Sequence, residues 1–270
     1  MNGKEKKLFV SSDIEGTCGI AAWTETDHGG VNAATYMRQM SRECAAAIEG
    51  ALDAGFDSAL VKDAHSSARN ISPELLPKEA KILRGWTNDP LVMMSGIDST
   101  FDAAIFTGYH SPAFSNGSPL AHTMTTRIVS IKLCGEYISE FTINALTAAH
   151  FGVPVIMVTG DEYLCEEAKK LIPDITTVAV NKGIGGGSIS IHPDLAVEKI
   201  RDGAKAAASG DMKRCIAKIP PHLSVEVIFR NQSDAYKCGF YPGVTRTNAN
   251  TIVFETDSFD SFLSFQLFCL

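Results

Sequence analysis

One stretch indicates the fold most clearly: Ala103-Ala104-Ile105-Phe106-Thr107-Gly108-Tyr109-His110. It begins with an uninterrupted apolar run and ends with Gly108-Tyr109-His110. A short apolar run of this kind is typical of a strand that is buried on both faces of a sheet. Similar runs occur at Leu8-Phe9-Val10, Ala59-Leu60-Val61 and Val153-Pro154-Val155-Ile156-Met157-Val158. Helical patterns lie between the runs or follow them, at 36–55, 140–150 and 162–171. Continuous apolar strands that alternate with helices predict an α/β fold, with a mostly parallel sheet flanked by helices.

Residues at the helix ends support these predicted bounds. Ser139 and Asp161 precede the second and third helices, where a side-chain oxygen can accept a hydrogen bond from a free backbone N–H group. Gly55 and Gly152 follow the first and second helices, at the position where glycine commonly ends a helix.

The pattern changes after Val180. The glycine-rich stretch 183–188 is interpreted as a flexible loop, and it matches neither the G-x-G-x-x-G pattern nor a P-loop. A helix is expected at 193–209, and strands are expected at 223–229 and 251–255. We predict a metal-binding catalytic α/β region at 1–185 and a smaller mixed α/β C-terminal part at 186–270. The alternative is that the second part completes the same domain.

The composition excludes several classes of protein. The 270 residues carry 24 Lys+Arg and 31 Asp+Glu, a formal net charge of −7, which argues against a nucleic-acid partner. No apolar stretch approaches the roughly 18 residues of a membrane helix, so no membrane partner is expected. The basic start at 1–7 is followed only by Leu8-Phe9-Val10, which is too short for a signal peptide, so we expect a cytoplasmic protein. The 7 cysteines are scattered and form no Cys-x-x-Cys pair, which indicates reduced thiols.

Candidate metal ligands follow three of the predicted strands. The first strand leads to Asp13 and Glu15, the second to His65 and the third to His110. The carboxyl ends of parallel strands meet at one edge of a sheet, where ligands bind in α/β proteins. Two carboxylates side by side repel each other unless a cation lies between them. Carboxylate and imidazole together suit zinc, and suit manganese or cobalt less specifically.

A fourth histidine, His122, lies in a modestly apolar loop. Its position is compatible with a general acid or base and also with a buried structural residue, and spacing alone leaves both open. The other histidines flank turns or helix ends and are interpreted as structural or solvated; they are His28, His150, His192 and His222.

Several short motifs resemble zinc peptidase family M55, the DppA-type D-aminopeptidases. The motifs are, in order, Ser12-Asp13-Ile14-Glu15-Gly16, Lys62-Asp63-Ala64-His65-Ser66, Gly108-Tyr109-His110, Ala121-His122-Thr123-Met124 and Glu140-Phe141-Thr142-Ile143-Asn144-Ala145. The resemblance covers about the first 180 residues well and the remainder loosely. Each motif is short, but five of them in this order are specific.

The resemblance implies a site with two zinc ions per subunit. Asp13, Glu15 and His65 would hold one ion, and Asp13, His110 and Glu140 would hold the other, with Asp13 shared. Three protein ligands per zinc leave an open position for a bridging hydroxide, as in catalytic zinc sites. His122 matches the catalytic histidine of the family.

The resemblance also implies a substrate and an assembly. The family hydrolyses short peptides from the amino end, prefers D-residues such as D-Ala, and forms homodecamers of stacked pentameric rings. We therefore expect a di-zinc aminopeptidase with a short peptide as its substrate. The alternative is a non-catalytic peptide-binding or transport-accessory protein, and a metal-dependent phosphoesterase ranks lower because basic residues are sparse near the motifs.

The sequence leaves two details open. Ser139 and Thr142 stand where the family has glycines beside its fifth ligand, and Glu136 is therefore a rival to Glu140. Glu140 is preferred because Asn144 and Ala145 fix the register of the motif. Ala121 and Thr123 beside His122 also differ from the family, so preference for D-residues remains a separate question from hydrolysis.

Overall fold

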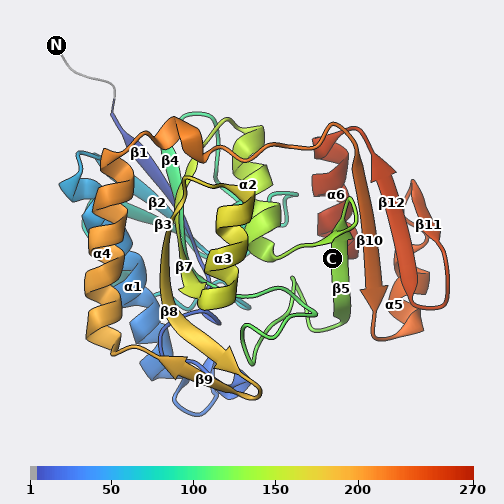
Figure 1. The fold of residues 1–270 in the computed structure, drawn as a ribbon, viewed down its shortest axis with the longest axis horizontal. Coiled ribbons are helices and arrows are strands. Elements are labelled where there is room, and N and C mark those ends of the chain that lie inside the picture. Colours follow the sequence, from blue (N-terminus) through green and yellow to red (C-terminus); the bar gives the residue numbers. More distant parts are fainter. Residues whose placement is uncertain (1–4) are drawn as a thin grey trace.

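β4 (Ala103–Tyr109) lies in the middle of a seven-stranded sheet in the computed structural model, which describes residues 5–270 (Figure 1). All neighbouring strands of this sheet run parallel except the last pair, which is antiparallel. The sheet order is β3 (Ala80–Leu83), β2 (Ser58–Asp63), β1 (Lys7–Ser12), β4, β7 (Val155–Asp161), β8 (Thr176–Ile184) and β9 (Gly187–Ser190). The predicted α/β class with a mostly parallel sheet is confirmed.

The apolar runs are continuous because both faces of the sheet are covered. Every residue of β4 and β7 is buried, and β1 is buried from Leu8 onward. α1 (Ala33–Asp53) and α4 (Pro193–Ser209) pack together on one face of the sheet, and α2 (Glu140–His150) and α3 (Glu162–Leu171) lie on the other (Figure 1). Burial on both faces removes the polar alternation that a half-exposed strand would show.

The expected capping residues of α2 and α3 are confirmed. The Ser139 side chain accepts a hydrogen bond from the backbone N–H of Thr142, and Asp161 accepts one from Leu164. These bonds satisfy backbone donors at the starts of α2 and α3. α1 begins at Ala33, three residues before the predicted start at Tyr36, after Asn32 in a left-handed conformation. The prediction was wrong at this end because Asn32 makes no side-chain capping bond and gives no clear start signal.

A second, antiparallel sheet lies beside the first (Figure 1). Its order is β11 (Val244–Arg246), β12 (Thr251–Thr256), β10 (Leu223–Phe229), β5 (Ile128–Leu133) and β6 (Glu136–Tyr137). α5 (Gln232–Cys238) and α6 (Phe259–Cys269) accompany it. Short 3-10 helices occur at Trp23–Glu25, Pro73–Leu75, Val92–Met94 and Met212–Cys215.

The prediction of a flexible loop at 183–188 is wrong. β8 and β9 pair as a hairpin in which Gly183 lies opposite Ser188 and Ile184 lies opposite Gly187. Gly185 supplies the positive φ of 56° that the tight turn needs. The glycines therefore mark a hairpin turn at the edge of the sheet.

The two sheets do not follow the predicted division at residue 185. β5 and β6 come from the first part of the chain but pair within the second sheet. β9 and α4 lie beyond 185, but β9 belongs to the first sheet and α4 packs against it. The division at 185 stays a prediction. Residues 1–4, part of the basic start, lie outside the described residues. Within 5–270, no helix has the length and apolarity to cross a bilayer. The 7 cysteines are free thiols, as expected.

Candidate metal centre

Three neighbouring strands deliver the candidate ligands to one edge of the first sheet. β1, β2 and β4 are adjacent and parallel, so their carboxyl ends lie together. The backbone N–H of Asp13 donates to Thr107 of β4 at 2.9 Å, and that of Ala64 donates to Ser12 of β1 at 2.9 Å. These bonds extend the pairing past the strand ends and fix the segments that carry Asp13 and His65.

Two glycines allow these segments to approach the Tyr109 carbonyl group closely. A Cβ atom on Gly16 would lie 1.7 Å from the Tyr109 oxygen, and one on Gly160 would lie 1.9 Å from it. Both distances are far inside van der Waals contact, so only glycine fits. The Asp13–Glu15 segment and the end of β7 therefore pack directly on the backbone that leads into His110.

The first group of candidate ligands is Asp13, Glu15 and His65. The Nδ1 atom of His65 lies 3.4 Å from an Asp13 oxygen and 3.1 Å from a Glu15 oxygen. All three side chains are buried. One donor atom from each residue lies within 4.8 Å of the others, a spacing that could hold a metal ion.

The second group shares Asp13 and adds His110 and Glu140. The Nε2 atom of His110 lies 3.5 Å from an Asp13 oxygen and 3.5 Å from a Glu140 oxygen. Its Nδ1 atom lies 2.9 Å from the carbonyl oxygen of Ser111. Because a carbonyl can only accept, Nδ1 carries a hydrogen, and Nε2 of a neutral imidazole is then free to bind a metal.

Asp161 fixes Ser111 and so helps to orient His110. It accepts hydrogen bonds from the backbone N–H and the hydroxyl of Ser111 and from the N–H of Leu164. The sequence indicated Asp161 only as a helix cap, and its contact with Ser111 comes from the β4–β7 pairing. No local sequence signal would have revealed it.

Buried polar atoms without hydrogen-bond partners gather in the two groups. They are Asp13 Oδ2, Glu15 Oε2, His65 Nε2 and His110 Nε2. Burial without a partner is costly for such atoms. Burial, followed by the charge of Glu15, raises the pKa of Asp13 well above its usual range. Burial alone would lower the pKa of His65, but Glu15 and Asp13 outweigh it and raise this pKa to about 11. The surrounding protein atoms thus leave part of the hydrogen-bonding capacity of these buried side chains unused.

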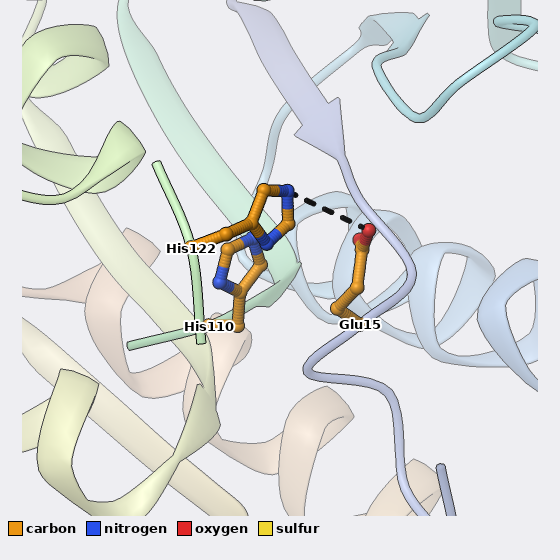
Figure 2. A group of neighbouring side chains, drawn as sticks. All are labelled: Glu15, His110 and His122. Atoms are coloured by element: carbon orange, nitrogen blue, oxygen red, sulfur yellow. Dashed lines mark ion pairs between the residues drawn. The ribbon is translucent and has the colours of Figure 1, made fainter. Parts of the chain in front are cut away.

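His122 lies beside Glu15 of the first group and His110 of the second (Figure 2). Its ring stacks on His110 with centroids 4.3 Å apart, and its Nε2 atom faces oxygens of Glu15 at 3.9 Å and Glu140 at 3.6 Å. Its Nδ1 atom lies 2.9 Å from the Leu120 carbonyl oxygen. Burial, followed by the charge of His110, lowers its pKa. The lowered pKa favours the neutral ring, and with a hydrogen on Nδ1 the lone pair of that ring lies on Nε2, which faces the site.

The rival carboxylates Glu136 and Glu140 differ in environment. Glu140 is buried at the first position of α2 and accepts a hydrogen bond from the backbone N–H of Met124 at 2.6 Å. Glu136 is exposed on β6 and belongs to none of the candidate ligand groups found among residues 5–270. The structure brings Glu140 together with the other candidate ligands and leaves Glu136 apart from them.

A cavity of about 1070 Å³ opens over the two groups. Asp13, Glu15, His65 and Glu140 lie in its wall together with His122. Sites for small ligands measure roughly 300–1,000 Å³, so this cavity has room for a peptide of several residues.

Comparisons with known proteins agree with this geometry. The family model of Peptidase M55, described as D-aminopeptidase, matches residues 6–267. The D-aminopeptidase of Bacillus subtilis (strain 168) is 31% identical over 253 residues, which cover 92% of this chain and 91% of the relative. The solved structure of the Zn-dependent D-aminopeptidase DppA from Bacillus subtilis, described as a self-compartmentalizing protease, matches with a TM-score of 0.90 and 28% identity. That match covers 97% of this chain and 95% of the other. The chain therefore belongs to the D-aminopeptidase family, Peptidase M55, as its sequence motifs indicated, and is an enzyme of the peptidase class.

Proposed function

We propose that this protein is a di-zinc aminopeptidase that removes the first residue from short peptides and prefers D-residues such as D-Ala. One observation carries the proposal. Asp13 belongs to two separate groups of buried donor atoms, one with Glu15 and His65 and the other with His110 and Glu140. A shared carboxylate between two three-residue groups is the donor arrangement that a pair of neighbouring metal ions requires.

The residues present fit zinc. The donors are carboxylate oxygens and imidazole nitrogens, which are ordinary zinc ligands. Four of these donor side chains have a buried atom that lacks a hydrogen-bond partner. Three carboxylates would balance most of the charge of two Zn²⁺ ions. The same charges without a cation would repel each other in a buried setting.

Zinc held by these residues would polarise the scissile carbonyl group and make a water molecule more acidic. The chain itself supplies the proton transfer. His122 holds a lone pair at Nε2, because its Nδ1 hydrogen points to Leu120. A neutral imidazole in that orientation can accept a proton and later return it to the leaving amino group. Trp23 packs edge-on against His122, with ring centroids 5.1 Å apart, and helps to hold the ring in this orientation.

The assembly and the location belong to the same proposal. Support for an oligomer comes from the description of the related DppA structure as self-compartmentalizing. We propose a homodecamer of stacked pentameric rings, which at 29.0 kDa per chain would have a mass of 10 × 29.0 = 290 kDa. A cytoplasmic location stays a prediction within the same proposal. No specific observation favours the alternative of a non-catalytic peptide-binding or transport-accessory protein.

The test is hydrolysis of matched dipeptides, D-Ala-Gly and L-Ala-Gly, by protein loaded with zinc and by protein treated with chelator. We expect release of D-Ala to exceed release of L-Ala and to stop with chelator. Metal analysis should give two zinc ions per chain. Full activity with less than about one zinc per chain would contradict the proposal.

Two variants separate metal binding from proton transfer. Asp13→Ala should lose both zinc ions because both groups share this residue, whereas Asp202→Ala, an exposed change on α4, should lose none. His122→Ala should keep both ions and lose turnover by about 10²–10⁴-fold, the usual contribution of a general acid or base. Unchanged kcat in His122→Ala would remove this residue from the mechanism, and full zinc content in Asp13→Ala would rule out the shared ligand.

A further inference from the structure

Two arginines line the same cavity as the candidate ligands but belong to the other sheet. Arg127 directly precedes β5 and Arg230 directly follows β10. The two strands are antiparallel neighbours, and Phe229 lies opposite Ile128 at their ends. The cavity therefore spans both sheets, with the candidate ligands on one side and this pair of cations on the other.

The backbone holds the two arginines side by side. The N–H group of Arg230 donates to the carbonyl oxygen of Arg127 at 2.8 Å. The Nε atom of Arg230 also donates to the Thr126 carbonyl oxygen at 2.6 Å. This second bond orients the guanidinium group and leaves its two terminal nitrogens available. These nitrogens form the planar fork that binds a carboxylate with two hydrogen bonds.

The two arginines differ in their counter-charges. Arg127 pairs with Asp234 at 3.1 Å and donates to the main-chain oxygen of Leu270, the last residue of the sequence, at 3.2 Å. Arg230 has no carboxylate within ion-pair distance among residues 5–270. Asp234 therefore compensates the charge of Arg127 but not that of Arg230. The uncompensated charge of Arg230 therefore favours an anionic group in this part of the cavity.

The proposed reaction brings such a group into the same cavity. An aminopeptidase must hold the first peptide bond of its substrate at the metal ligands, and the rest of the peptide then extends along the cavity. We propose that Arg230, supported by Arg127, binds a carboxylate of the peptide on the C-terminal side of the bond that is cut. This inference rests on the proposed function. Such a subsite would select short peptides whose carboxylate reaches the arginines.

Three kinds of substrate test this subsite and identify the source of the carboxylate. The first is D-Ala-(Gly)n with a free C-terminus, for n of 1 to 4. The second is the same series as C-terminal amides. The third is the amide series with D-Glu as its last residue, which offers only a side-chain carboxylate. We expect kcat/KM for the best free acid to exceed that of its amide by roughly tenfold, the low end of the effect of one charge-assisted hydrogen bond, because the arginine is exposed.

Arg230→Gln is the decisive variant. It should remove the preference for the carboxylate by raising KM for the acid, while kcat/KM for the amide falls much less. Because the arginine is exposed, the preference of the unchanged protein should also fall as salt is raised. Arg214→Gln is the matched control, since it removes an exposed positive charge outside the cavity and should keep the full preference.

The outcomes are distinct. If the free acid is cleaved faster than both amides, the arginines bind the C-terminal carboxylate. If the D-Glu amide exceeds the plain amide as much as the free acid does, a side-chain carboxylate is also bound. Equal rates for all three substrates, or the same ratios in Arg230→Gln, overturn the inference.

A binding measurement separates this inference from the proposed function. Calorimetry with zinc-loaded protein would compare peptides in which a reduced amide replaces the first peptide bond, as free acid and as amide. If no peptide is hydrolysed but the acid binds better through Arg230, the subsite is supported and the proposed reaction is wrong. If neither hydrolysis nor binding distinguishes acid from amide, the subsite is overturned.

Discussion

Glu43 is a buried carboxyl group outside the metal centre. It lies on α1, where one oxygen accepts hydrogen bonds from the Cys18 backbone N–H and from the Gln39 side chain. Its other oxygen has no partner. Burial raises the pKa of Glu43 from its ordinary value of 4.5 to about 7. The folded protein therefore holds a proton on this group at pH values where the unfolded chain has released it.

This raised pKa predicts a loss of stability as the pH increases. Between about pH 4.5 and 7 the folded state binds more protons at Glu43 than the unfolded state, so the free energy of unfolding falls through this range. Glu43→Gln mimics the protonated form and lacks this dependence. Between pH 5 and 8 its stability relative to the unchanged protein should rise by about 3 kcal/mol. Urea unfolding with saturating zinc at each pH measures the difference.

Glu198→Gln is the control, because this side chain is exposed on α4. This control shows whether the removal of an exposed carboxylate also changes the dependence of stability on pH. A difference for Glu43→Gln that stays flat from pH 5 to pH 8 would show that Glu43 is ionised in the folded protein throughout.

Single residues also show what the sequence could predict about the site. Asp13, Glu15, His65 and His110 were predictable because each follows an apolar strand within a few positions, and adjacent parallel strands bring such positions together. Arg230 was not predictable. Its proximity to Arg127 depends on the pairing of β5 with β10, which joins segments about a hundred positions apart in the sequence.

At the scale of elements, α2 connects the metal centre to the cavity wall. Glu140 and Asn144 lie one turn apart on this helix, so they face the same side. Asn144 donates a hydrogen bond to the Tyr109 hydroxyl, which lies 2.6 Å from the hydroxyl of Ser11. Ser11 in turn donates to the carbonyl oxygen of Met93, which lines the cavity.

The direction of these bonds is fixed. Ser11 uses its only hydrogen on Met93, so Tyr109 must donate to Ser11 and accept from Asn144. The amide of Asn144 also contacts the sulfur of Met93 at 3.4 Å. A buried chain of donors therefore runs from α2 to the cavity wall, and each member depends on its neighbour.

Breaking this chain should destabilise the protein. Asn144→Leu leaves the buried Tyr109 hydroxyl without its donor and should lower the free energy of unfolding by about 1–3 kcal/mol. Ser11→Ala should have an effect of similar size. The double variant should cost clearly less than the sum of the two, because both changes break one network. Urea unfolding curves measure all three.

A surface asparagine provides the comparison. Asn231→Leu changes an exposed residue that makes no side-chain capping bond, and it should shift stability by no more than about 0.5 kcal/mol. Additive effects of Asn144→Leu and Ser11→Ala would contradict a continuous chain of bonds.

Elements differed in how well the sequence predicted them. The helices at 140–150, 162–171 and 193–209 and the strand at 223–229 have the predicted bounds, because capping residues, apolar runs or alternating burial mark them locally. β5, β6 and β11 were not predicted. They are short antiparallel strands whose stability comes from partners distant in the sequence rather than from their own composition.

For the whole molecule, metal binding and folding should be linked. The candidate ligands follow β1, β2 and β4 or begin α2, so an ion bound between them joins segments that unfolding separates. Two zinc sites at about a hundredfold excess over Kd would add about 5 kcal/mol to the free energy of unfolding. For a chain of this size that corresponds to roughly 10 °C in Tm.

Thermal unfolding with and without chelator, at one protein concentration, tests this link. Chelator should lower Tm by roughly that amount for the unchanged protein and leave Asp13→Ala unaffected, since this variant would hold no zinc. An equal effect of chelator on both proteins would show that stabilisation by metal does not depend on Asp13.

The close packing of Gly16 and Gly160 on the Tyr109 carbonyl group has a consequence for how this site can evolve. Any replacement of either glycine adds at least one carbon atom where there is no space. The separation between the segment that carries Asp13 and Glu15 and the backbone that leads into His110 therefore cannot be adjusted in small mutational steps at these positions. Descendants of this sequence can vary the parts of the cavity wall away from the candidate ligands and His122, including both arginines, while the spacing of the ligands is inherited unchanged. Changes in substrate choice should thus accumulate without changes in the metal centre.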